Sequence, residues 1–383
     1  MKNTKTRQAQ LCMSNQKILM LFVEPAPYIL DLIAILKKNY HGQLDVAFLE
    51  KKFSQNWNIS VINDCFFLPK QASLKLKWLY AIFIKRKYDI LSIAGWSHPI
   101  TLIIIIFGKL FHIPVIVDSD TPLFPQTSRL KRIVKKIIYP MLFKFPTLFL
   151  PAGTRQADYL KHYGVPDKKI ILEKMTVDVA GIQNYTATLT DSFKNQLREN
   201  LGIQKDDCVF LFIGRLIERK GIVELLGAFS KIKNEKIKCV IAGDGPLIDQ
   251  VIAATVKNPN IIYTGWLEKK DLLNLYAICE VFVLPAHYEP WGLVINEAMA
   301  AGKRVIVSNA VGCVDDLVFH QKNGLIIPPH DSQALSEAIQ DFADNPQLCA
   351  TMSQASLSII QKWTLQDEAK QIFSAWYQTN ASG

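Results

Sequence analysis

The chain has 383 residues, 49% of them hydrophobic and 20% charged, which is an ordinary globular composition and enough length for two domains of ~150 residues. Seven dispersed cysteines without a CxxC pair argue against a disulfide framework and for reduced thiols in a cytoplasmic protein. Residues 1–190 carry 26 Lys and Arg against 12 Asp and Glu, whereas residues 191–383 carry 18 against 22. This excess of positive charge indicates that the first half binds an anionic surface or a polyanion. No nucleic-acid-binding motif accompanies the charge.

Short apolar runs in the first half predict five strands, at residues 18–23, 44–48, 90–94, 114–118 and 147–150, with helical stretches between them. The first run is too short for the apolar core of a secretory signal, which needs ~7–15 residues and a cleavage site. The most hydrophobic stretch, residues 100–107, falls short of the ~20 apolar residues of a membrane-spanning helix. We therefore predict a buried helix over residues 100–107.

Residues 128–145 (SRLKRIVKKIIYPMLFKF) predict a basic amphipathic helix. The segment contains both cationic and aliphatic residues. The cations are Arg129, Lys131, Arg132, Lys135 and Lys136, and the aliphatic residues are Leu130, Ile133, Val134, Ile137 and Ile138. The pattern is compatible with a helix that lies on an anionic membrane surface. It is also compatible with a core-facing helix whose basic side is in water, so both interpretations stay open.

Six further runs predict the strands of the second half, at residues 209–213, 238–242, 260–264, 281–284, 304–307 and 325–327. Val- and Ile-rich runs that alternate with helices are typical of parallel sheets covered on both faces. We predict two doubly wound α/β domains, residues 1–190 and 191–362. Residues 363–383 contain a last helix, with apolar residues at helical spacing at Leu365, Ala369, Ile372, Phe373 and Trp376.

Four loops of the second half follow predicted strands, and ligands of open parallel sheets bind at the carboxyl ends of strands. The loops read GRLIERKG, GDGPL, PAHYEPWG and SNAVGC. In the first loop, Gly214 ends the strand, and Arg215 and Lys220 precede the next helix. Two cations beside a helix N-terminus suit a diphosphate, because Arg binds phosphate oxygens in pairs and Lys adds a point charge. A solvated basic loop is the alternative.

The segment HYEPWGLVINEAMAAG places two carboxylates around a helix start. Gly292 would let backbone N–H groups approach an anion closely. We predict a helix from near Trp291, with Glu297 about two turns into it, where its carboxylate could accept hydrogen bonds from ribose hydroxyls. Glu289, ahead of the helix, could hold sugar hydroxyls, or it could simply be a favourable anion at a helix N-terminus.

These loops, together with TGWL, VGCVDDLV and NGLIIP, resemble the retaining GT-B glycosyltransferases of family 4 over most of residues 205–330. The segment YLKHYGVPDKKIILEKMTVDV, which contains Asp178 near its end, extends the resemblance more faintly into the first half. The resemblance implies two facing Rossmann-like domains with the reaction in the cleft, and a C-terminal helix that crosses back to the first domain. It implies a nucleotide-diphosphate sugar, UDP- or GDP-linked, as the donor.

The resemblance also implies roles for single residues. Arg215 and Lys220 are expected to bind the donor diphosphate, Glu297 the ribose and Glu289 the transferred sugar. Further donor contacts are expected from the same loops, at Gly214, Gly243, Gly245, Pro290, Trp291, Gly292 and Leu293. The site is expected to work without a metal or another cofactor, with the acceptor hydroxyl attacking from the face of the leaving group.

The first half departs from the family's pattern after its first strand, where EPAPY (residues 24–28) stands in place of a Gly-rich loop. His98, in GWSHP, is the acceptor-side and catalytic candidate, with a structural role as the alternative. Asp118-Ser119-Asp120 matches the D-x-D pattern that can hold a divalent cation. Since it lies in the half opposite the donor loops, we interpret Asp120 as an acceptor contact and Asp118 as structural.

The sequence thus predicts a hexosyltransferase that acts on a saccharide or lipid-linked acceptor in bacterial surface polysaccharide or glycolipid synthesis. We expect it in the cytoplasm, in peripheral contact with an anionic membrane and without nucleic acid. An NAD-dependent oxidoreductase is one alternative, since Gly243-x-Gly245 begins like a dinucleotide fingerprint, although Ile248 stands where the third glycine belongs. An inactive nucleotide-sugar-binding protein is the other.

Overall fold

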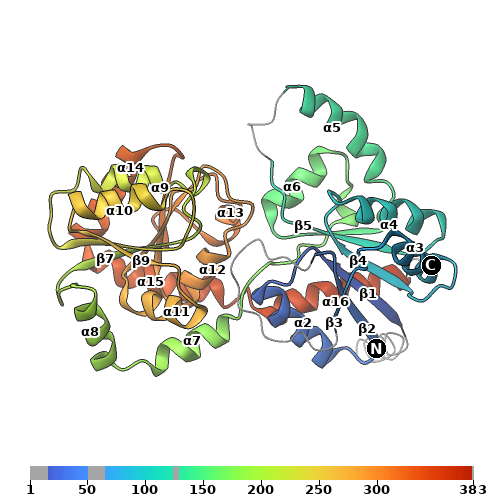
Figure 1. The fold of residues 1–383 in the computed structure, drawn as a ribbon, viewed down its shortest axis with the longest axis horizontal. Coiled ribbons are helices and arrows are strands. Elements are labelled where there is room, and N and C mark those ends of the chain that lie inside the picture. Colours follow the sequence, from blue (N-terminus) through green and yellow to red (C-terminus); the bar gives the residue numbers. More distant parts are fainter. Residues whose placement is uncertain (1–15, 51–64, 124–128, 382–383) are drawn as a thin grey trace. The chain divides into compact units, whose positions relative to one another are not determined.

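The structure is a computed structural model that describes residues 16–50, 65–123 and 129–381. The chain forms two compact units, each with a six-stranded parallel sheet between layers of helices (Figure 1). Unit 1 comprises residues 1–175 and 365–383, and unit 2 comprises residues 176–364. The division falls ahead of the predicted boundary at residues 190/191, because α7 (Val179–Thr188) and α8 (Asp191–Asn200) pack on α11 (Lys269–Ile278) of unit 2.

The sheet of unit 1 has the strand order 3-2-1-4-5-6, and every neighbouring pair runs parallel. Most of its central side chains are buried, which is why these strands appear as continuous apolar runs in the sequence. The direction of winding reverses between the first and fourth strands, and ligands bind at such a switch point. From edge to edge the strands are β3 (Cys65–Phe67), β2 (Gln43–Phe48), β1 (Lys17–Phe22), β4 (Ile90–Ala94), β5 (Val115–Ser119) and β6 (Leu148–Pro151).

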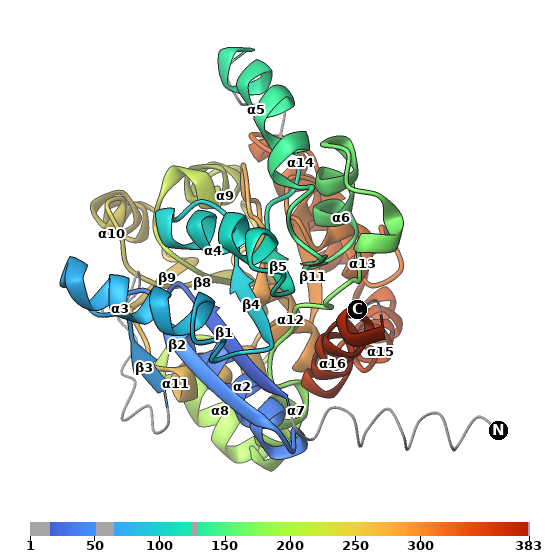
Figure 2. The same ribbon diagram turned by 90° about the vertical axis from the view of Figure 1, so that its right-hand side faces the viewer.

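Two hydrophobic cores cover the two faces of this sheet. On one face lie α2 (Pro27–Asn39) and the C-terminal α16 (Leu365–Ala381), both labelled in Figure 2. The buried indole of Trp376 meets the ring of Tyr40 edge-on at 5.3 Å. On the other face lie the helices α3 (Ala72–Phe83), α4 (Pro99–Leu110) and α6 (Thr154–His162). The last helix therefore belongs to unit 1, although it follows unit 2 in the chain.

The hydrophobic stretch 100–107 is part of α4, and its inner side is buried through Ile100, Ile104 and Ile105. Its outer side leaves Leu110 exposed. Across the residues that the structure describes, no helix has both the length and the apolar character needed to cross a membrane. The prediction of a packed helix is thus confirmed.

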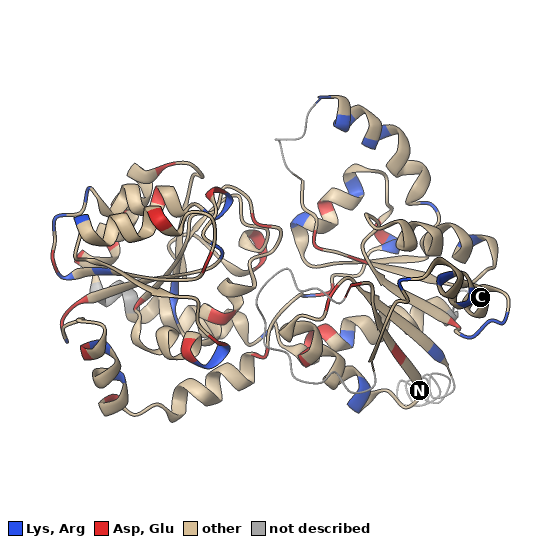
Figure 3. Ribbon diagram, viewed as in Figure 1, with Lys and Arg blue, Asp and Glu red and all other residues tan. Residues whose placement is uncertain are grey.

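The basic helix α5 (Arg129–Leu142) contains no buried residue. Its aliphatic side chains are among the most exposed of the protein, at 72% for Leu130 and 62% for Ile137. Figure 3 shows the basic residues along the same helix. The core-facing interpretation is therefore wrong for these side chains, because an apolar stripe and a basic side both face solvent.

The sheet of unit 2 repeats the strand order of unit 1, again with every neighbouring pair parallel. Its strands, from edge to edge, are β9 (Ile261–Gly265), β8 (Ile237–Ala242), β7 (Cys208–Ile213), β10 (Val281–Leu284), β11 (Arg304–Ser308) and β12 (Gly324–Ile327). The helices α9 (Ile222–Phe229), α10 (Ile248–Lys257) and α14 (Ser332–Asp344) cover one face (Figure 1). The other face carries α11, α12 (Leu293–Ala300) and α15 (Pro346–Ile360), and α13 (Val314–Leu317) follows β11.

The predicted α/β architecture with two doubly wound parallel sheets is confirmed, and every predicted strand lies within one residue of its observed ends. The sequence did not predict β3, because its three residues are too few to form a recognisable pattern. No disulfide joins any of the cysteines at described positions.

Candidate active site

In unit 2 the winding reverses between β7 and β10. The strands β8, β7, β10 and β11 are neighbours in the sheet, and the four loops singled out in the sequence follow these four strands. The topology therefore brings all four loops to one carboxyl edge, at the switch point where open α/β sheets bind ligands.

Lys220 and Glu289 join the loop after β7 to the loop after β10. Nζ of Lys220 donates to Oε2 of Glu289 at 2.6 Å, and both side chains are mostly buried. Nη1 of Arg219 lies 3.8 Å from the same oxygen and donates to the carbonyl of Tyr288 at 3.3 Å. Arg215, at the start of the first loop, is exposed. A carboxylate and three cations thus stand around the switch point.

Two glycines allow the loops of this edge to touch. Gly221 has φ +74°, and a Cβ there would lie 2.0 Å from the carbonyl oxygen of Pro285. Gly243 has φ +146°, and a Cβ there would lie 1.9 Å from the carbonyl oxygen of Gly214. Gly243 is therefore needed for loop packing. Its loop follows the second strand of the sheet, whereas a dinucleotide fingerprint follows the first, so the oxidoreductase alternative loses its supporting feature.

Gly292, with φ +99°, is the residue before α12. The helix begins slightly later than predicted, so Glu297 lies just over one turn into it rather than two. The carboxylate of Glu297 accepts a hydrogen bond from the hydroxyl of Tyr276 at 3.0 Å. Desolvation raises the pKa of Glu297, while the bond from Tyr276 and the charge of Lys269 oppose that rise. Neither of these two supporting residues was predicted, because nothing in the local sequence marks them.

The indole of Trp291 is buried and packs 5.4 Å from the ring of Trp363. Its Nε1 donates to Asn296 at 3.1 Å, and Asn296 donates to Thr176 at 3.2 Å. These contacts give the side chain a packing role, so a donor contact of Trp291 would come from its backbone. Pro290 and Leu293, at either side of the helix start, are partly exposed.

In unit 1, His98 precedes α4 and caps it, because Nδ1 accepts a hydrogen bond from the backbone N–H of Ile100 at 3.2 Å. The structural role that the sequence left open is therefore present. The cap leaves Nε2 of His98 for another contact, at the carboxyl end of β4 and beside the switch point of unit 1.

Four carboxylates gather at the same edge of unit 1. Glu173 and Glu368 are buried, with 8% and 2% exposed. Burial raises the pKa of Asp118 to about 8, and burial together with the charges of Asp118, Glu368 and Asp120 raises the pKa of Glu173. The sequence predicted roles for Asp118 and Asp120 alone, because Glu173 and Glu368 come from other parts of the chain. Glu173 lies in the segment whose backbone bonds to Pro151 at the end of β6, and Glu368 lies in α16.

Replacement of Asp118 by asparagine should stabilise the protein at pH 8. Since the folded pKa of Asp118 lies above its ordinary value, the folded state holds the proton more tightly, and the free energy of unfolding falls as the pH rises from about 4 to about 8. The variant should gain about 1–3 kcal/mol at pH 8 and little at pH 4. Thermal melts at both pH values measure this, with Asp158→Asn as an exposed control. Equal melting of variant and wild type at pH 8 would contradict the assigned burial.

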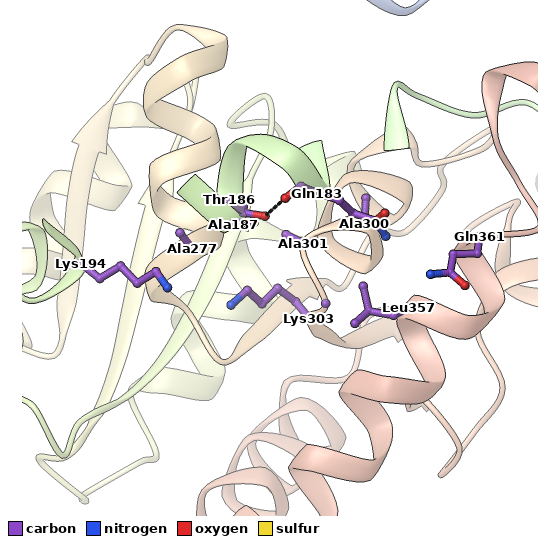
Figure 4. Close-up of a pocket in the computed structure, with 11 residues that line it drawn as sticks. Gln183, Thr186, Ala187, Lys194, Ala277, Ala300, Ala301, Lys303, Leu357 and Gln361 are labelled. Atoms are coloured by element: carbon purple, nitrogen blue, oxygen red, sulfur yellow. Dashed lines mark hydrogen bonds between the residues drawn. The ribbon is translucent and has the colours of Figure 1, made fainter. Parts of the chain in front are cut away.

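A cavity of about 410 Å³ opens at the far end of α12 (Figure 4). Its lining includes Ala300 and Lys303 at the C-terminal end of that helix, together with Thr186 and Lys194. Because Gly292 stands at the N-terminal end of α12, this cavity is separate from the edge that carries the predicted donor loops.

Residues 193–358 match the family model described as Glycosyl transferases group 1. The chain is 32% identical over 170 residues to the Uncharacterized glycosyltransferase MJ1607 of Methanocaldococcus jannaschii, a match that covers 43% of each protein. It is 26% identical over 222 residues to the N,N'-diacetylbacillosaminyl-diphospho-undecaprenol alpha-1,3-N-acetylgalactosaminyltransferase of Campylobacter jejuni, covering 58% of this chain and 57% of that protein. The matches thus span about half the length of these relatives.

Among solved structures, the complex of Anabaena HepE with UDP has a TM-score of 0.76 at 19% identity and covers 94% of this chain and 100% of that one. Its complex with UDP-glucose has a TM-score of 0.74 at 18% identity. Likeness at this level of identity establishes the fold alone. The match to the family model concerns the second half of the chain. The protein therefore has the GT-B fold, and its residues 193–358 match the glycosyl transferases group 1 family model.

Proposed function

We propose that the protein is a retaining glycosyltransferase of family 4 that transfers a sugar from a UDP- or GDP-linked donor to a saccharide or lipid-linked acceptor in surface polysaccharide or glycolipid synthesis. The observation that carries the proposal is the ion pair between Lys220 and Glu289, which joins the loops after β7 and β10 at the switch point of unit 2. Two similar proteins support it. HepE structures contain UDP or UDP-glucose, and the Campylobacter relative is named for an acceptor linked to diphospho-undecaprenol.

In this reaction the bond between the anomeric carbon and the β-phosphate oxygen breaks, and a nucleoside diphosphate leaves with the bonding electrons. The acceptor hydroxyl forms the new bond on the same face, and its proton passes to the departing β-phosphate oxygen, which carries the bonding electrons. Arg215 and Lys220 would stabilise the charge that grows on the diphosphate, together with the N-terminal amides of α12. Glu289 would hold hydroxyls of the transferred sugar, and Glu297 would accept hydrogen bonds from the ribose.

Donor turnover should survive an excess of EDTA. The two proposed phosphate-binding cations are side chains, and the D-x-D pattern at Asp118 and Asp120 lies in unit 1, outside the unit that carries the donor loops. Nucleotide release measured with and without chelator tests this. Loss of turnover that Mn²⁺ or Mg²⁺ restores would show that a divalent cation takes part.

We also propose that α5 lies on an anionic membrane surface. An exposed stripe that includes Leu130, Ile137 and Met141 can enter the boundary between headgroups and acyl chains, while the cations of the same helix meet anionic headgroups. Exposed apolar side chains on α3 and α4, Leu76 and Leu110, lie on helices that pack on the same face of the unit 1 sheet. A lipid-linked acceptor would account for both this surface and the positive charge of the first half.

Calorimetric titration with UDP, GDP and NADH tests the class of ligand. We expect binding of a nucleoside diphosphate, with weaker binding in Lys220→Gln because the variant loses a cation at the diphosphate. Binding of NADH without either nucleoside diphosphate would favour the oxidoreductase alternative and contradict the proposal.

A further inference from the structure

Three side chains that the sequence did not single out meet at the carboxyl edge of unit 2. Glu224 lies in the first turn of α9, His287 in the loop after β10 and His330 in the loop after β12. One potential ligand atom of each lies within 4.8 Å of the other two. Among the described residues, this is the one group of three or more His, Cys, Asp or Glu side chains with such geometry.

The contacts within this cluster leave two buried polar atoms without a hydrogen bond. Nε2 of His287 and Oε2 of Glu224 are 2.7 Å apart, yet neither atom has a hydrogen-bond partner of suitable direction in the described part of the chain. Both side chains are largely buried, so solvent screens them little. Nδ1 of His330 lies 3.9 Å from the second oxygen of the same carboxylate, and the two imidazole rings are 3.6 Å apart between centroids.

A single proton could bridge one imidazole to the carboxylate, whereas a coordinated ion serves both imidazoles at once. We propose that Glu224, His287 and His330 bind one transition-metal ion, for which Zn²⁺ is the best fit. Two nitrogens and one carboxylate oxygen are ligands that zinc takes in proteins, with a fourth position left for water. Zinc–ligand bonds of ~2.0–2.1 Å at tetrahedral angles separate two ligand atoms by ~3.3 Å. This separation lies between the 2.7 Å from His287 and the 3.9 Å from His330 to the oxygens of Glu224.

The ion would tie together three segments of unit 2. His287 precedes Glu289 by two residues, and its backbone N–H donates to the carbonyl of Arg219 at 2.9 Å, so the ion would also hold the contact between the loops after β7 and β10. None of the three ligands is among the residues proposed to bind the donor. We therefore assign the ion a stabilising role at this edge of unit 2, and its binding can be measured without the proposed transfer reaction.

The test uses the full chain without an affinity tag, stripped of metal with a chelator and then dialysed. Titration with Zn²⁺, followed by calorimetry and thermal melting, should give one ion per chain and a rise in Tm of roughly 5 °C at ~100-fold excess over Kd. Mg²⁺ and Ca²⁺ should give no rise, since these ions prefer oxygen ligands. Ni²⁺ should substitute for Zn²⁺, because imidazole suits both ions.

His330→Gly is the decisive variant. His330 has φ +61°, a conformation that glycine adopts freely, so the variant should fold as wild type in the absence of zinc. Its Tm should no longer respond to zinc, and its affinity for zinc should fall by at least ~100-fold with a ligand removed. The matched control is His112→Gly in unit 1, an exposed histidine with φ +57°, which should keep the zinc response.

Two outcomes would overturn the proposal. Wild-type protein that neither binds Zn²⁺ nor gains stability from it would show that the cluster is held by a proton. An unchanged zinc response in His330→Gly would place the ion elsewhere. The experiment measures zinc binding and Tm, and neither measurement depends on whether the protein transfers a sugar.

Discussion

Lys220→Gln should lower donor turnover by on the order of 10²-fold, which corresponds to a few kcal/mol of lost charge stabilisation at the leaving diphosphate. Lys220 is the cation fixed at the switch point by its 2.6 Å bond to Glu289. Glutamine can still donate a hydrogen bond to that carboxylate, so the variant removes the charge without leaving Glu289 isolated. Steady-state kinetics gives the rate, and a thermal melt shows whether the fold is intact.

Arg215→Ala should have a similar effect on turnover and a smaller one on stability, since Arg215 is exposed. Lys257→Ala, which removes an exposed cation from α10, is the matched control and should keep the wild-type rate. Turnover near wild type in both Lys220→Gln and Arg215→Ala would contradict the assignment of this loop to the diphosphate.

Loss of four cations from α5 should weaken binding to anionic vesicles by on the order of 10³-fold, because each Lys or Arg near such a surface contributes ~1 kcal/mol. Wild-type protein should sediment with anionic vesicles at low salt, remain in solution with neutral ones and dissociate at high salt, where screening is strong. The variant replaces with glutamine the residues Lys131, Arg132, Lys135 and Lys136.

The control for this experiment removes an equal charge from unit 2, at the exposed lysines Lys205, Lys233, Lys236 and Lys257. It should sediment as wild type does, so net charge alone would not explain the loss. A second variant, Ile137→Glu, tests the apolar stripe without removing a cation. If wild type ignores anionic vesicles, or if the quadruple α5 variant sediments fully, then α5 is not a membrane contact.

The sequence predicted the fold well because buried parallel strands leave long apolar signals. The runs at β4 and β10 were predicted with their observed ends, since both strands are buried and bounded by polar loops. The division between units was placed too late, because the polar surface of α7 and α8 resembles a linker until their packing on α11 is known.

For the candidate site, the sequence predicted the residues that lie in distinctive loops but not those that support them. The pairing of Lys220 with Glu289 across 69 positions follows from topology, which places the first and fourth strands of unit 2 side by side. Tyr276, which donates to Glu297, and the cluster around Glu224 come from helices and loops whose local sequence carries no signal. The carboxylates Glu173 and Glu368 were missed for the same reason.

Nucleotide release from a panel of UDP-, GDP- and ADP-sugars is the most direct test of the central claim, that the carboxyl edge of unit 2 binds and cleaves a nucleotide-sugar donor. Wild-type protein should release the nucleoside diphosphate from one class of donor, faster with a lipid-linked or saccharide acceptor than without. The rate of nucleotide release should fall by on the order of 10²-fold in both Lys220→Gln and Glu289→Gln. The rate in Lys257→Ala should equal that of the wild type. No release from any donor by folded wild-type protein, or full activity in both site variants, would contradict the account.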